Sequence, residues 1–500
     1  MGLMPSMVAV GAVSDQRARL WLRTEATGPF TAAVWTCGGL VRTALVADCR
    51  APDADGTMAF TVPDDAPALG PLAPATPYGF RIVVARTGEV VGEGRFETAP
   101  AEGPRGRFAF AFMSCHQPFR SDGSVHPASA RMLEVLEPAL ASRGVKYVLL
   151  IGDQMYADAP RASSLLRAGH KPPLLKASVA EIRACYQARY REYWALPAMR
   201  RLQARWPTWC MWDDHEIVND WGATPVHRQR AWRRVFEGAR LAFIDYQVSR
   251  TMSPGAAWPV AFDQAFVWGS AATFLMDVSS QRTSDGRTAQ VYGPDQLAAL
   301  MAFLREQRAR PVVFVVIPVP LVFLPDWLVA LGERVPGQGA LFATRWNAAR
   351  NRWARDQLIE VLWAHQRANP GQTLVLLSGD VHQGAAVAWR WPDGAHAYQL
   401  VSSAVTNALR GWKERIAQRL SFRMSHVRHG TERLAIERLQ GTGPGQQNPF
   451  NGLNVGVVHV EDEGASAAVR FELLTCDTGA PGTPRVAYAS GRLSGGHILR

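Results

Sequence analysis

The sequence lacks the long hydrophobic run that a membrane-spanning helix needs. Such a helix takes about 20 consecutive apolar residues, and the longest candidate, residues 312–324, is interrupted by Pro318 and Pro320. Residues 1–11 are apolar, but no basic segment precedes them, so the sequence as it stands shows no secretory signal. We therefore expect a cytoplasmic protein, or a periplasmic or secreted one if a leader has been removed.

Cysteine is scarce and never closely paired. The six cysteines stand at positions 37, 49, 115, 185, 210 and 476, and no Cys-x-x-Cys pair occurs among them. This spacing argues against a zinc ribbon and gives no disulfide framework. A reducing compartment fits this pattern best. Internal repeats and low-complexity tracts are also absent from the sequence.

The composition is that of a globular protein with an excess of positive charge. Hydrophobic residues make up 47% and charged residues 19% of the 500 residues, which excludes disorder as the main state. The net charge of +11 favours anionic substrates. No short basic and aromatic motif of a nucleic-acid-binding module is present, so we expect no specific nucleic-acid partner.

The first hundred residues differ in pattern from the rest. Short alternating runs at Ala18–Arg23 and 80–85 are separated by Gly, Pro and Asp clusters. Short strands at this spacing predict a small antiparallel sandwich over residues 1–100, of the fibronectin III or immunoglobulin type. A Pro-rich linker at 98–104 would separate it from a second domain at 105–500.

From residue 108 onward, apolar runs alternate with helical patterns, and this alternation predicts an α/β fold with helices packed on a central sheet. The strands are expected at 108–113, 145–151, 206–212, 272–276, 312–317 and 373–377. The helices are expected at 128–142, 228–246, 295–308 and 346–365.

Two segments break this rhythm. Residues 319–343 are apolar and rich in Pro and Gly, and we expect a buried insert there, with an apolar lid as the alternative. Residues 406–439 are basic and predicted to be helical. Within that segment, 411–423 is expected to be a surface helix packed on the domain, with peripheral membrane contact as the alternative.

Polar side chains follow the apolar strands directly. They occupy residues 114–117, 152–158, 212–220 and 378–383. Because ligand sites in α/β sheets lie beyond the carboxyl ends of the strands, we expect these side chains at one edge of the sheet. Hard oxygen donors together with imidazole and thiolate groups suit Fe(III), Zn, Mn or Ca.

Four of these segments together resemble a known family. Ser114-Cys115, Gly152-Asp153-x-x-Tyr156, residues 212–216 (Trp-Asp-Asp-His-Glu) and Ser378-Gly379-Asp380-x-His382 resemble the motifs of the PhoD-like alkaline phosphatases and phosphodiesterases, within the metallophosphoesterase superfamily. The Gly-Asp-x-x-Tyr motif is also similar to that of purple acid phosphatases. The resemblance spans about 105–475. It implies a β-sandwich flanked by helices and metal-dependent phosphoester hydrolysis, in which a metal-activated hydroxide attacks phosphorus in line.

The resemblance also implies roles for single residues. Fe(III) would be bound by Cys115, Asp153, Tyr156 and His382. Asp153 would bridge to a second, divalent ion, with calcium expected and zinc or manganese as alternatives. Asp380 and either Asp214 or Asn219 would complete that second site.

The remaining predicted residues act on the substrate. His215 would lie near the leaving group as a general acid or electrostatic stabiliser, next to Asp214. His116 and Arg282 are predicted to contact the substrate phosphate. The sequence departs from the superfamily after the strand at 312–317, where no histidine follows. The second ion would therefore be held mostly by oxygen donors.

The expected partner is a phosphate-ester small molecule, a lipid or a nucleotide, and the oligomeric state is left open. The alternative from another class is a non-catalytic, metal-stabilised protein that binds a polyanion. Among enzymes, a nuclease or phospholipase-type phosphodiesterase is the alternative to a monoesterase, because the same metal centre serves all of them.

Overall fold

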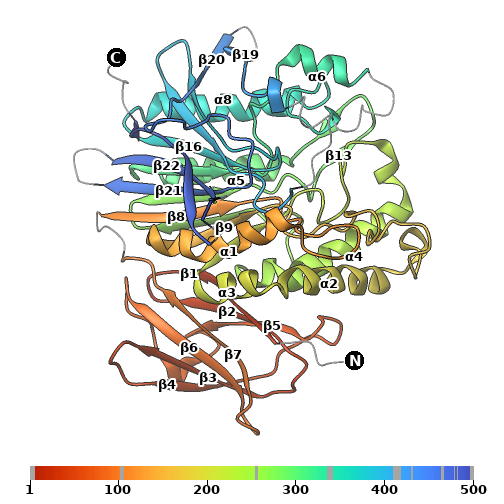
Figure 1. Ribbon diagram of the computed structural model, residues 1–500, viewed down its shortest axis with the longest axis vertical. Helices are drawn as coiled ribbons and strands as arrows, with labels where there is room; N and C mark the ends of the chain where they lie inside the picture. Colours follow the sequence, from red (N-terminus) through yellow and green to blue (C-terminus); the bar gives the residue numbers. More distant parts are fainter. Residues whose placement is uncertain are drawn as a thin grey trace.

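The computed structural model describes residues 6–101, 106–253, 257–334, 342–408, 418–429, 432–462, 467–477, 479–480 and 482–495. Two large sheets form its centre, and two small sheets from the N-terminal residues lie below a layer of helices (Figure 1). Most of the basic segment 411–423 falls outside the described residues, so the surface helix expected there stays a prediction.

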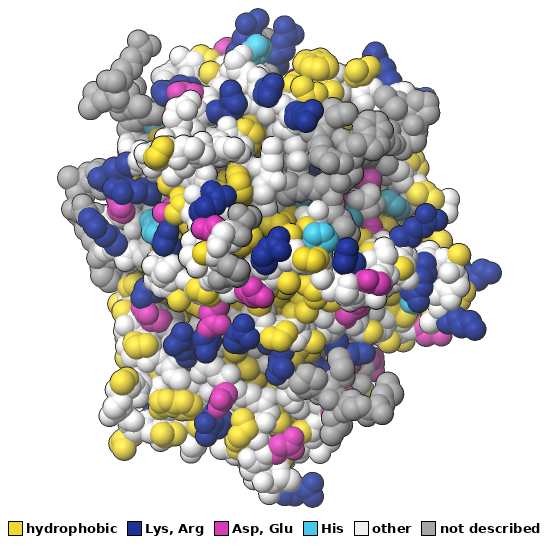
Figure 2. All heavy atoms as spheres, viewed as in Figure 1, with side chains coloured by type: hydrophobic (Ala, Val, Ile, Leu, Met, Phe, Trp, Pro, Cys, Tyr) yellow, Lys and Arg dark blue, Asp and Glu magenta, His cyan; other side chains and the backbone are white. Residues whose placement is uncertain are grey.

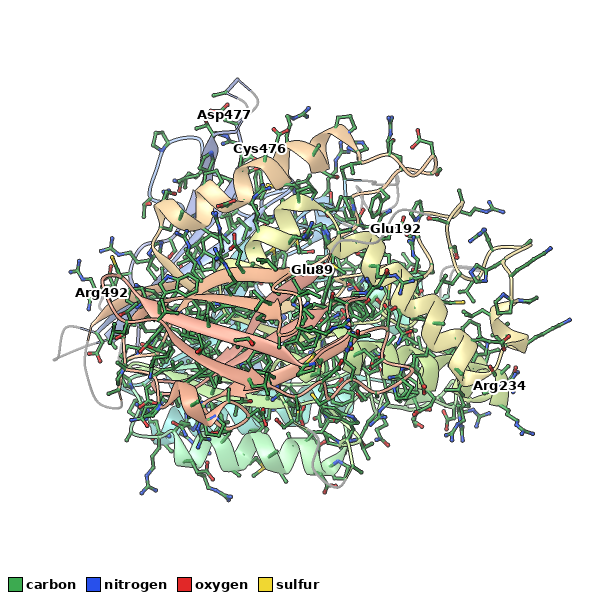
Figure 3. The ribbon with its side chains drawn as sticks, turned by 90° about the horizontal axis from the view of Figure 1, so that it is seen from below. Glu89, Glu192, Arg234, Cys476, Asp477 and Arg492 are labelled. Carbon is green, nitrogen blue, oxygen red and sulfur yellow. The ribbon has the colours of Figure 1, made fainter. Side chains whose placement is uncertain are left out.

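The N-terminal residues form antiparallel strands only. One sheet has the order β1-β2-β5, and the other has the order β4-β3-β6-β7. The strands are β1 (Met7–Val13), β2 (Ala18–Arg23), β3 (Phe30–Thr36), β4 (Arg42–Val46), β5 (Thr57–Val62), β6 (Pro77–Val84) and β7 (Val90–Glu97), with a short 3-10 helix η1 (Pro67–Leu69). Seen from below, these strands cross the middle of the molecule (Figure 3). In the same view, Arg234 of α4 lies at the periphery of the molecule.

The first large sheet has the order β10-β9-β8-β21-β22-β23, with β24 also paired to β22. Its strands are β8 (Arg107–Met113), β9 (Val145–Ile151), β10 (Thr208–Met211), β21 (Val455–Asp462), β22 (Ala467–Cys476), β23 (Pro484–Ala489) and β24 (Leu493–Ser494). Strands β8, β9 and β10 are parallel, so their carboxyl ends share one edge of the sheet.

The second large sheet has the order β11-β12-β15-β16-β18-β17-β20-β19, and β12, β15, β16 and β18 are parallel. Its strands are β11 (Gln264–Trp268), β12 (Ala271–Leu275), β15 (Val312–Val316), β16 (Thr373–Ser378), β17 (Ala385–Arg390), β18 (His396–Val401), β19 (His426–His429) and β20 (Glu432–Arg438). A separate two-stranded pair consists of β13 (Thr283–Ser284) and β14 (Ala289–Gln290).

Alternate side chains of the central strands face opposite layers, because successive residues of a strand point to opposite faces. Phe110 of β8 and Phe314 of β15 meet between the two large sheets, with ring centroids 5.0 Å apart. Ala111 of β8 instead joins the core beneath the helices, and Val315 joins a third core on the far side. Helices therefore cover the outer face of each large sheet, as Figure 1 also shows.

The helices fall into these two outer layers. One side carries α1 (Pro127–Ser142), α2 (Val179–Trp194), α3 (Pro197–Arg205) and α4 (Arg230–Tyr246), and the other carries α5 (Pro294–Glu306), α6 (Asp326–Gly332) and α8 (Arg352–Ala368). Short 3-10 helices are η2 (Leu174–Lys176), η3 (Pro225–Arg228) and η4 (Val248–Arg250). No helix in the described part of the chain is both long enough and apolar enough to cross a membrane.

The mixed α/β fold with several sheets confirms the predicted class, and two expectations need correction. The helix predicted over 406–439 is wrong at its C-terminal end, because β19 and β20 occupy that part. Val427, Leu434 and Ile436 are buried at alternate positions there, and pairing with β17 completes the sheet. The helix predicted to begin at 346 begins at Arg352, after a run of turns. Residues 319 and 321–324 are buried in the third core, whereas Trp327 and Leu331 are exposed, so the buried insert expected at 319–343 is found only in its first part. Residues 335–341 lie outside the described residues.

Candidate metal centre

The ends of strands from both large sheets meet at one point. The thiol of Cys115, which follows β8, lies 3.3 Å from Asp153 Oδ2, which follows β9. The same sulfur lies 3.6 Å from the carbonyl oxygen of Asp380, which follows β16 in the other sheet. The structure thus brings together residues that are up to 265 positions apart in the sequence.

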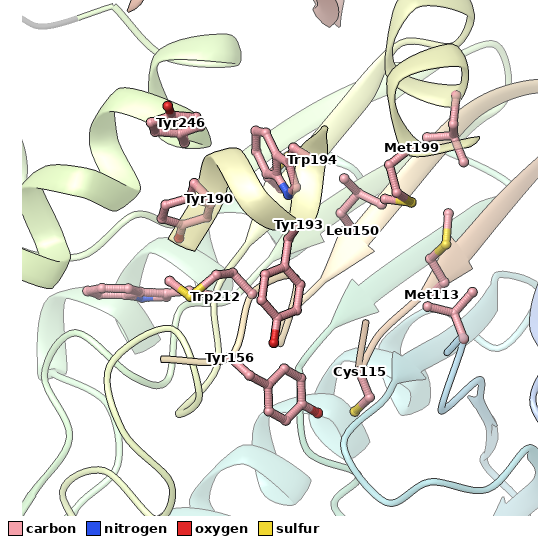
Figure 4. Close-up of a cluster of buried hydrophobic side chains, with 14 of the residues drawn as sticks. Met113, Cys115, Leu150, Tyr156, Tyr190, Tyr193, Trp194, Met199, Trp212 and Tyr246 are labelled. Carbon is pink, nitrogen blue, oxygen red and sulfur yellow. The ribbon is translucent and has the colours of Figure 1, made fainter. Parts of the chain in front are cut away.

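Asp153 is the centre of this cluster. Its Oδ2 accepts a hydrogen bond from the Tyr156 hydroxyl at 3.1 Å, and its Oδ1 accepts one from the backbone N–H of His215 at 3.3 Å. In Figure 4 the Cys115 sulfur and the Tyr156 hydroxyl lie close together at one border of a cluster of buried hydrophobic side chains. Thiol, phenol and carboxylate groups therefore share one small, buried space.

The backbone at these positions is unusual. Cys115, Asp153, Asp380 and His382 all have positive φ angles, between 53° and 58°. Such conformations cost free energy in residues other than glycine, and they concentrate at functional sites. At Gly152 the φ is 94°, and a Cβ atom there would lie 2.8 Å from the Cβ of Asp213. The glycine of the Gly-Asp motif is therefore required both by conformation and by the close approach of the next loop.

One carboxylate ties the loops after β9 and β10 together. Glu216 accepts hydrogen bonds from the backbone N–H groups of Asp153 at 2.9 Å, Gln154 at 2.7 Å and Asp213 at 3.0 Å. Burial, with Asp153 close by, raises the pKa of Glu216 to about 8. Glu216 thus fixes the backbone that presents the acidic side chains.

The acidic side chains are crowded. Ligand atoms of Asp153, Asp214 and His215 lie within 4.8 Å of one another, and so do those of Asp153, Asp213 and Asp380. Burial and the neighbouring carboxylates raise the pKa of Asp213 well above its usual value and that of Asp214 to about 8. Crowded, buried carboxylates of this kind are stabilised by a bound cation.

The thiol of Cys115 and the phenol of Tyr156 would also be stabilised, as anions, by a bound cation. Burial, together with nearby Asp153 and Asp380, raises the pKa of Cys115. Burial, with Asp153 and Cys115, raises the pKa of Tyr156 as well. Both groups bind metals as anions, and a cation at this point would favour the deprotonated forms. The donor set of this site therefore fits a metal centre.

His215 lies at the rim of the cluster, beside the carboxylate of Asp158. Its Nδ1 lies 2.7 Å from Asp158 Oδ1, and its ring stacks on Tyr156 with centroids 4.0 Å apart. Burial alone lowers the pKa of His215, but Asp158, Asp214 and Asp153 together raise it well above the usual value. The imidazolium form is therefore favoured.

His382 adjoins the same cluster. Its backbone N–H donates to Ser403 Oγ at 3.1 Å, and its Nε2 lies 3.3 Å from Asn407 Nδ2. The same amide nitrogen donates to the Tyr156 hydroxyl at 3.4 Å. His382 and Tyr156 therefore lie within reach of one amide group.

The other predicted residues lie in different surroundings. Asn219 is exposed, and its Nδ2 donates to Asp220 at 2.6 Å. His116 is fully buried, with Nδ1 at 2.9 Å from Thr406 Oγ1, and burial lowers its pKa to about 4. Arg282 is 8% exposed and donates to the Thr344 carbonyl at 2.7 Å.

Four further residues join the site without having been predicted. Asp213 and Asp158 stand within motifs already noted, so their positions in the sequence could have suggested them. Asn407 follows β18, which the sequence analysis did not identify. Arg345 forms an ion pair with Asp380 from a segment that carries no motif, and only the tertiary fold brings it there.

Comparison with known proteins identifies the family. Residues 110–443 match the PhoD-like phosphatase family. The chain belongs to the PhoD-like phosphatase family. The match covers the strand-end motifs at 114–117, 152–158, 212–220 and 378–383, so it includes the whole candidate metal centre.

Solved structures agree on the fold. A structure of PhoD is similar with a TM-score of 0.63 and 15% identity, over 99% of this chain and 94% of that one. The purple acid phosphatase PPD1 from yellow lupin seeds is similar with a TM-score of 0.56 and 11% identity, over 97% of this chain and 73% of that one. No curated protein sequence matches the chain.

Membership of the family confirms the predicted activity. This PhoD-like phosphatase is a metal-dependent phosphoester hydrolase. The metal dependence agrees with the two groups of crowded ligand atoms around Asp153. Small-molecule phosphoesters are the substrates that the family implies.

Proposed function

We propose that this PhoD-like phosphatase uses two cations held around Asp153. Cys115, Asp153, Tyr156 and His382 are the proposed ligands of Fe(III). Asp153, Asp380 and Asp214 are the proposed ligands of a second, divalent ion, with calcium preferred to zinc or manganese because oxygen donors dominate that side. Asp214 is preferred to Asn219, because its carboxylate lies among the crowded ligand atoms whereas Asn219 is exposed.

The chain's own residues complete the proposed chemistry. When bound, the cations supply positive charge that activates water and neutralises the phosphoryl oxygens. His215 donates the proton from Nε2 to the departing oxygen of the ester. Asp158 holds Nδ1 at 2.7 Å, and the stacked Tyr156 ring fixes the plane of the imidazole. The proposed general acid is thus paired with a carboxylate and oriented before the substrate arrives.

The observation that carries this proposal is the crowding of ligand atoms around one buried aspartate at the strand ends. We propose a small phosphate monoester or diester as the substrate, and the chemistry of the centre suits both. A non-catalytic binding protein for polyanions is disfavoured by the match to a phosphatase family. On the face shown in Figure 2, Lys and Arg side chains are spread out and form no single basic patch.

The proposed division places a fibronectin III-like domain at residues 1–100 and the catalytic domain at 105–500. Support comes from the described strands β1–β7, which pair only with one another. A reducing, cytoplasmic location is proposed because all six cysteines are free thiols.

The decisive variant for the proposed function is Asp153→Asn. It removes a negative charge from both proposed metal sites, and we expect turnover of p-nitrophenyl phosphate and bis-p-nitrophenyl phosphate to fall by roughly 1,000-fold or more. Asp122→Asn, on an exposed loop, is the matched control and should retain activity. Full activity of Asp153→Asn, or wild-type activity that survives exhaustive chelation, would contradict the proposed mechanism.

Iron is tested separately through Tyr156. A phenolate bound to Fe(III) gives a visible charge-transfer band, so the purified protein should be coloured and Tyr156→Phe should lose the colour. Tyr193→Phe is a suitable control, since its ring is equally buried but belongs to α2. A colourless wild-type protein with full activity would rule out iron at this position.

A further inference from the structure

We propose that Arg345 contacts the phosphoryl group of the substrate and that Arg282 positions Arg345 from behind. The proposal rests on the proposed function, because it assigns the oxyanion-binding groups of the same site. Arg345 lies between the insert at 319–324 and α8, and its Nη1 forms an ion pair with Asp380 Oδ2. No motif in the sequence singles this residue out.

The guanidinium of Arg345 is held at the metal centre by two contacts. Besides the ion pair with Asp380, its Cζ lies 5.5 Å from the centroid of the Phe323 ring. The side chain is 14% exposed. Within the described residues, no acceptor contacts Nε or Nη2, which leaves these donors for an incoming oxyanion. A planar guanidinium can bind phosphate through two parallel hydrogen bonds.

The backbone around Arg345 is fixed on both sides. Asn351 Nδ2 donates to the carbonyl oxygens of Ala343 and Arg345, each at 2.8 Å. Arg282 Nη2 donates to the carbonyl oxygen of Thr344, the residue directly before Arg345, at 2.7 Å. Three hydrogen bonds thus set the direction in which the Arg345 side chain leaves the chain.

Arg282 is placed to position the backbone of Arg345 and not to contact the phosphate itself. It is 8% exposed, and Gly222 approaches it so closely that a Cβ atom there would lie 2.7 Å from Arg282 Cγ. The sequence-based prediction gave Arg282 the phosphate contact. In the structure its Nη2 donates to the backbone next to Arg345, while Asp213, Asp214 and Asp220 lie near its guanidinium. Because of the hydrogen bond to the backbone, we assign Arg282 as a positioning residue.

The negative charge around the site favours a positively charged side chain next to the substrate phosphate. Asp213, Asp214, Asp220 and Asp380 surround the site, and a phosphate dianion would be repelled by them without compensating positive charge. Arg345 lies on the side of Asp380, whereas His215 lies on the side of Asp158. Arg345 would therefore contact the non-bridging oxygens of the substrate, and His215 would contact the leaving oxygen.

The test compares Arg345→Ala and Arg345→Lys with the wild-type enzyme, each reconstituted with saturating metal. Binding of inorganic phosphate is measured by calorimetry and by competitive inhibition, and metal content by elemental analysis. We expect Arg345→Ala to weaken phosphate binding by roughly 10- to 100-fold, with Arg345→Lys intermediate. Metal content at saturation should equal that of the wild type.

Arg350→Ala is the matched control. Arg350 stands in the same segment, but its guanidinium contacts Glu333 and the carbonyl oxygen of Ala223. We expect its phosphate affinity to be unchanged. Should Arg345→Ala fail to fold, Arg345→Lys and Arg345→Gln keep the test intact.

The positioning role of Arg282 is tested by a double-mutant cycle. Arg282→Met should weaken phosphate binding by less than Arg345→Ala does, and the double variant should bind phosphate no more weakly than Arg345→Ala alone. Additive effects of the two substitutions would contradict the assignment, because they would mean that Arg282 acts independently.

Two other outcomes separate the inference from the proposed function. If Arg345→Ala lowers metal affinity but binds phosphate like the wild type once metal is saturating, Arg345 is only the counter-ion of Asp380 and the inference is overturned. If the wild-type enzyme shows no metal-dependent hydrolysis, the proposed function fails, and the phosphate calorimetry still decides the role of Arg345.

Discussion

Asp277 supports the Trp-Asp-Asp-His-Glu loop from behind the metal centre. Its Oδ1 accepts hydrogen bonds from the Trp212 indole at 3.0 Å and from the backbone of Ser279 at 2.9 Å. A second carboxyl group, Asp263, accepts the backbone N–H of Asp277 and the amide of Gln296 through its Oδ1, both at 2.8 Å. Burial and the proximity of Asp277 raise the pKa of Asp263 to about 7.

This raised pKa makes the free energy of unfolding depend on pH. The folded protein holds the Asp263 proton more tightly than the unfolded chain, whose aspartates titrate near pH 4. The stability that this proton contributes is complete below that pH and is lost as the pH rises through about 7. Asp263→Asn keeps the Oδ1 acceptor and removes the charge. We expect the variant to gain roughly 2 kcal/mol over the wild type between pH 5 and pH 8.

Denaturant unfolding of both proteins at pH 5 and pH 8 measures this difference. Asp295→Asn, on the exposed first turn of α5, is the control and should leave the pH dependence as in the wild type. If the stability difference between Asp263→Asn and the wild type is the same at both pH values, Asp263 does not carry the buried proton.

The residues of the site were predictable to different degrees. Cys115, Asp153 and Asp380 stand directly after apolar strands, and parallel strands bring such positions to one edge whatever the details of the fold. Arg345 and Asn407 do not stand directly after a strand that the sequence predicts. They reach the site only because segments that are distant in the sequence pack against the strand ends. A local pattern therefore identified the groups that we propose as cation ligands, but not the group that we assign to the substrate.

At the scale of elements, the facing sheets provide a rigid platform for the strand-end loops. Phe314 of β15 is fully buried between the sheets and packs edge-to-face on Phe110 of β8. Strand β8 leads to Cys115, and the segment after β15 accepts, at the Pro318 carbonyl oxygen, a hydrogen bond from the backbone N–H of Gly379, the residue before Asp380. Packing between the sheets thus sets the distance between loops that come from different sheets.

Phe314→Ala should lower the free energy of unfolding by about 3–5 kcal/mol, because a large buried ring leaves a cavity. Denaturant unfolding measures the change. Leu40→Ala is the control, since Leu40 is 91% exposed and its loss should cost less than about 0.5 kcal/mol. A loss below about 1 kcal/mol for Phe314→Ala would mean that the sheets repack freely around this position.

The predictability of the elements follows from how they are buried. Strands such as β9 and β16 are apolar at nearly every position, because both faces are covered, and such runs are easily recognised. Strand β20 shows the opposite case. Its Arg and Glu residues resemble a helical composition, but only Leu434 and Ile436 face inward, and pairing with β17 and β19 decides its conformation. Tertiary pairing overrides local preference there.

At the scale of the whole molecule, the N-terminal sheets pack directly against the helices of the rest of the chain. Trp21 of β2 donates its indole N–H to the carbonyl oxygen of Asp245 at 2.8 Å. The fully buried guanidinium of Arg250 lies between Trp21 and Trp194, at 4.6 Å and 3.9 Å from their ring centroids. These contacts join β2 to α2 and α4, the helices that cover the sheet carrying Cys115 and Asp153. The N-terminal strands therefore buttress the helical layer behind the metal centre.

The account as a whole depends on cations bound where the strand ends of the two sheets meet. Anomalous diffraction from crystals of the wild-type protein, recorded on both sides of the iron absorption edge, tests this most directly. We predict a peak within bonding distance of Cys115 Sγ, Tyr156 Oη and Asp153, with a second metal site beside Asp380. Featureless density between these side chains in crystals of an active enzyme would contradict it.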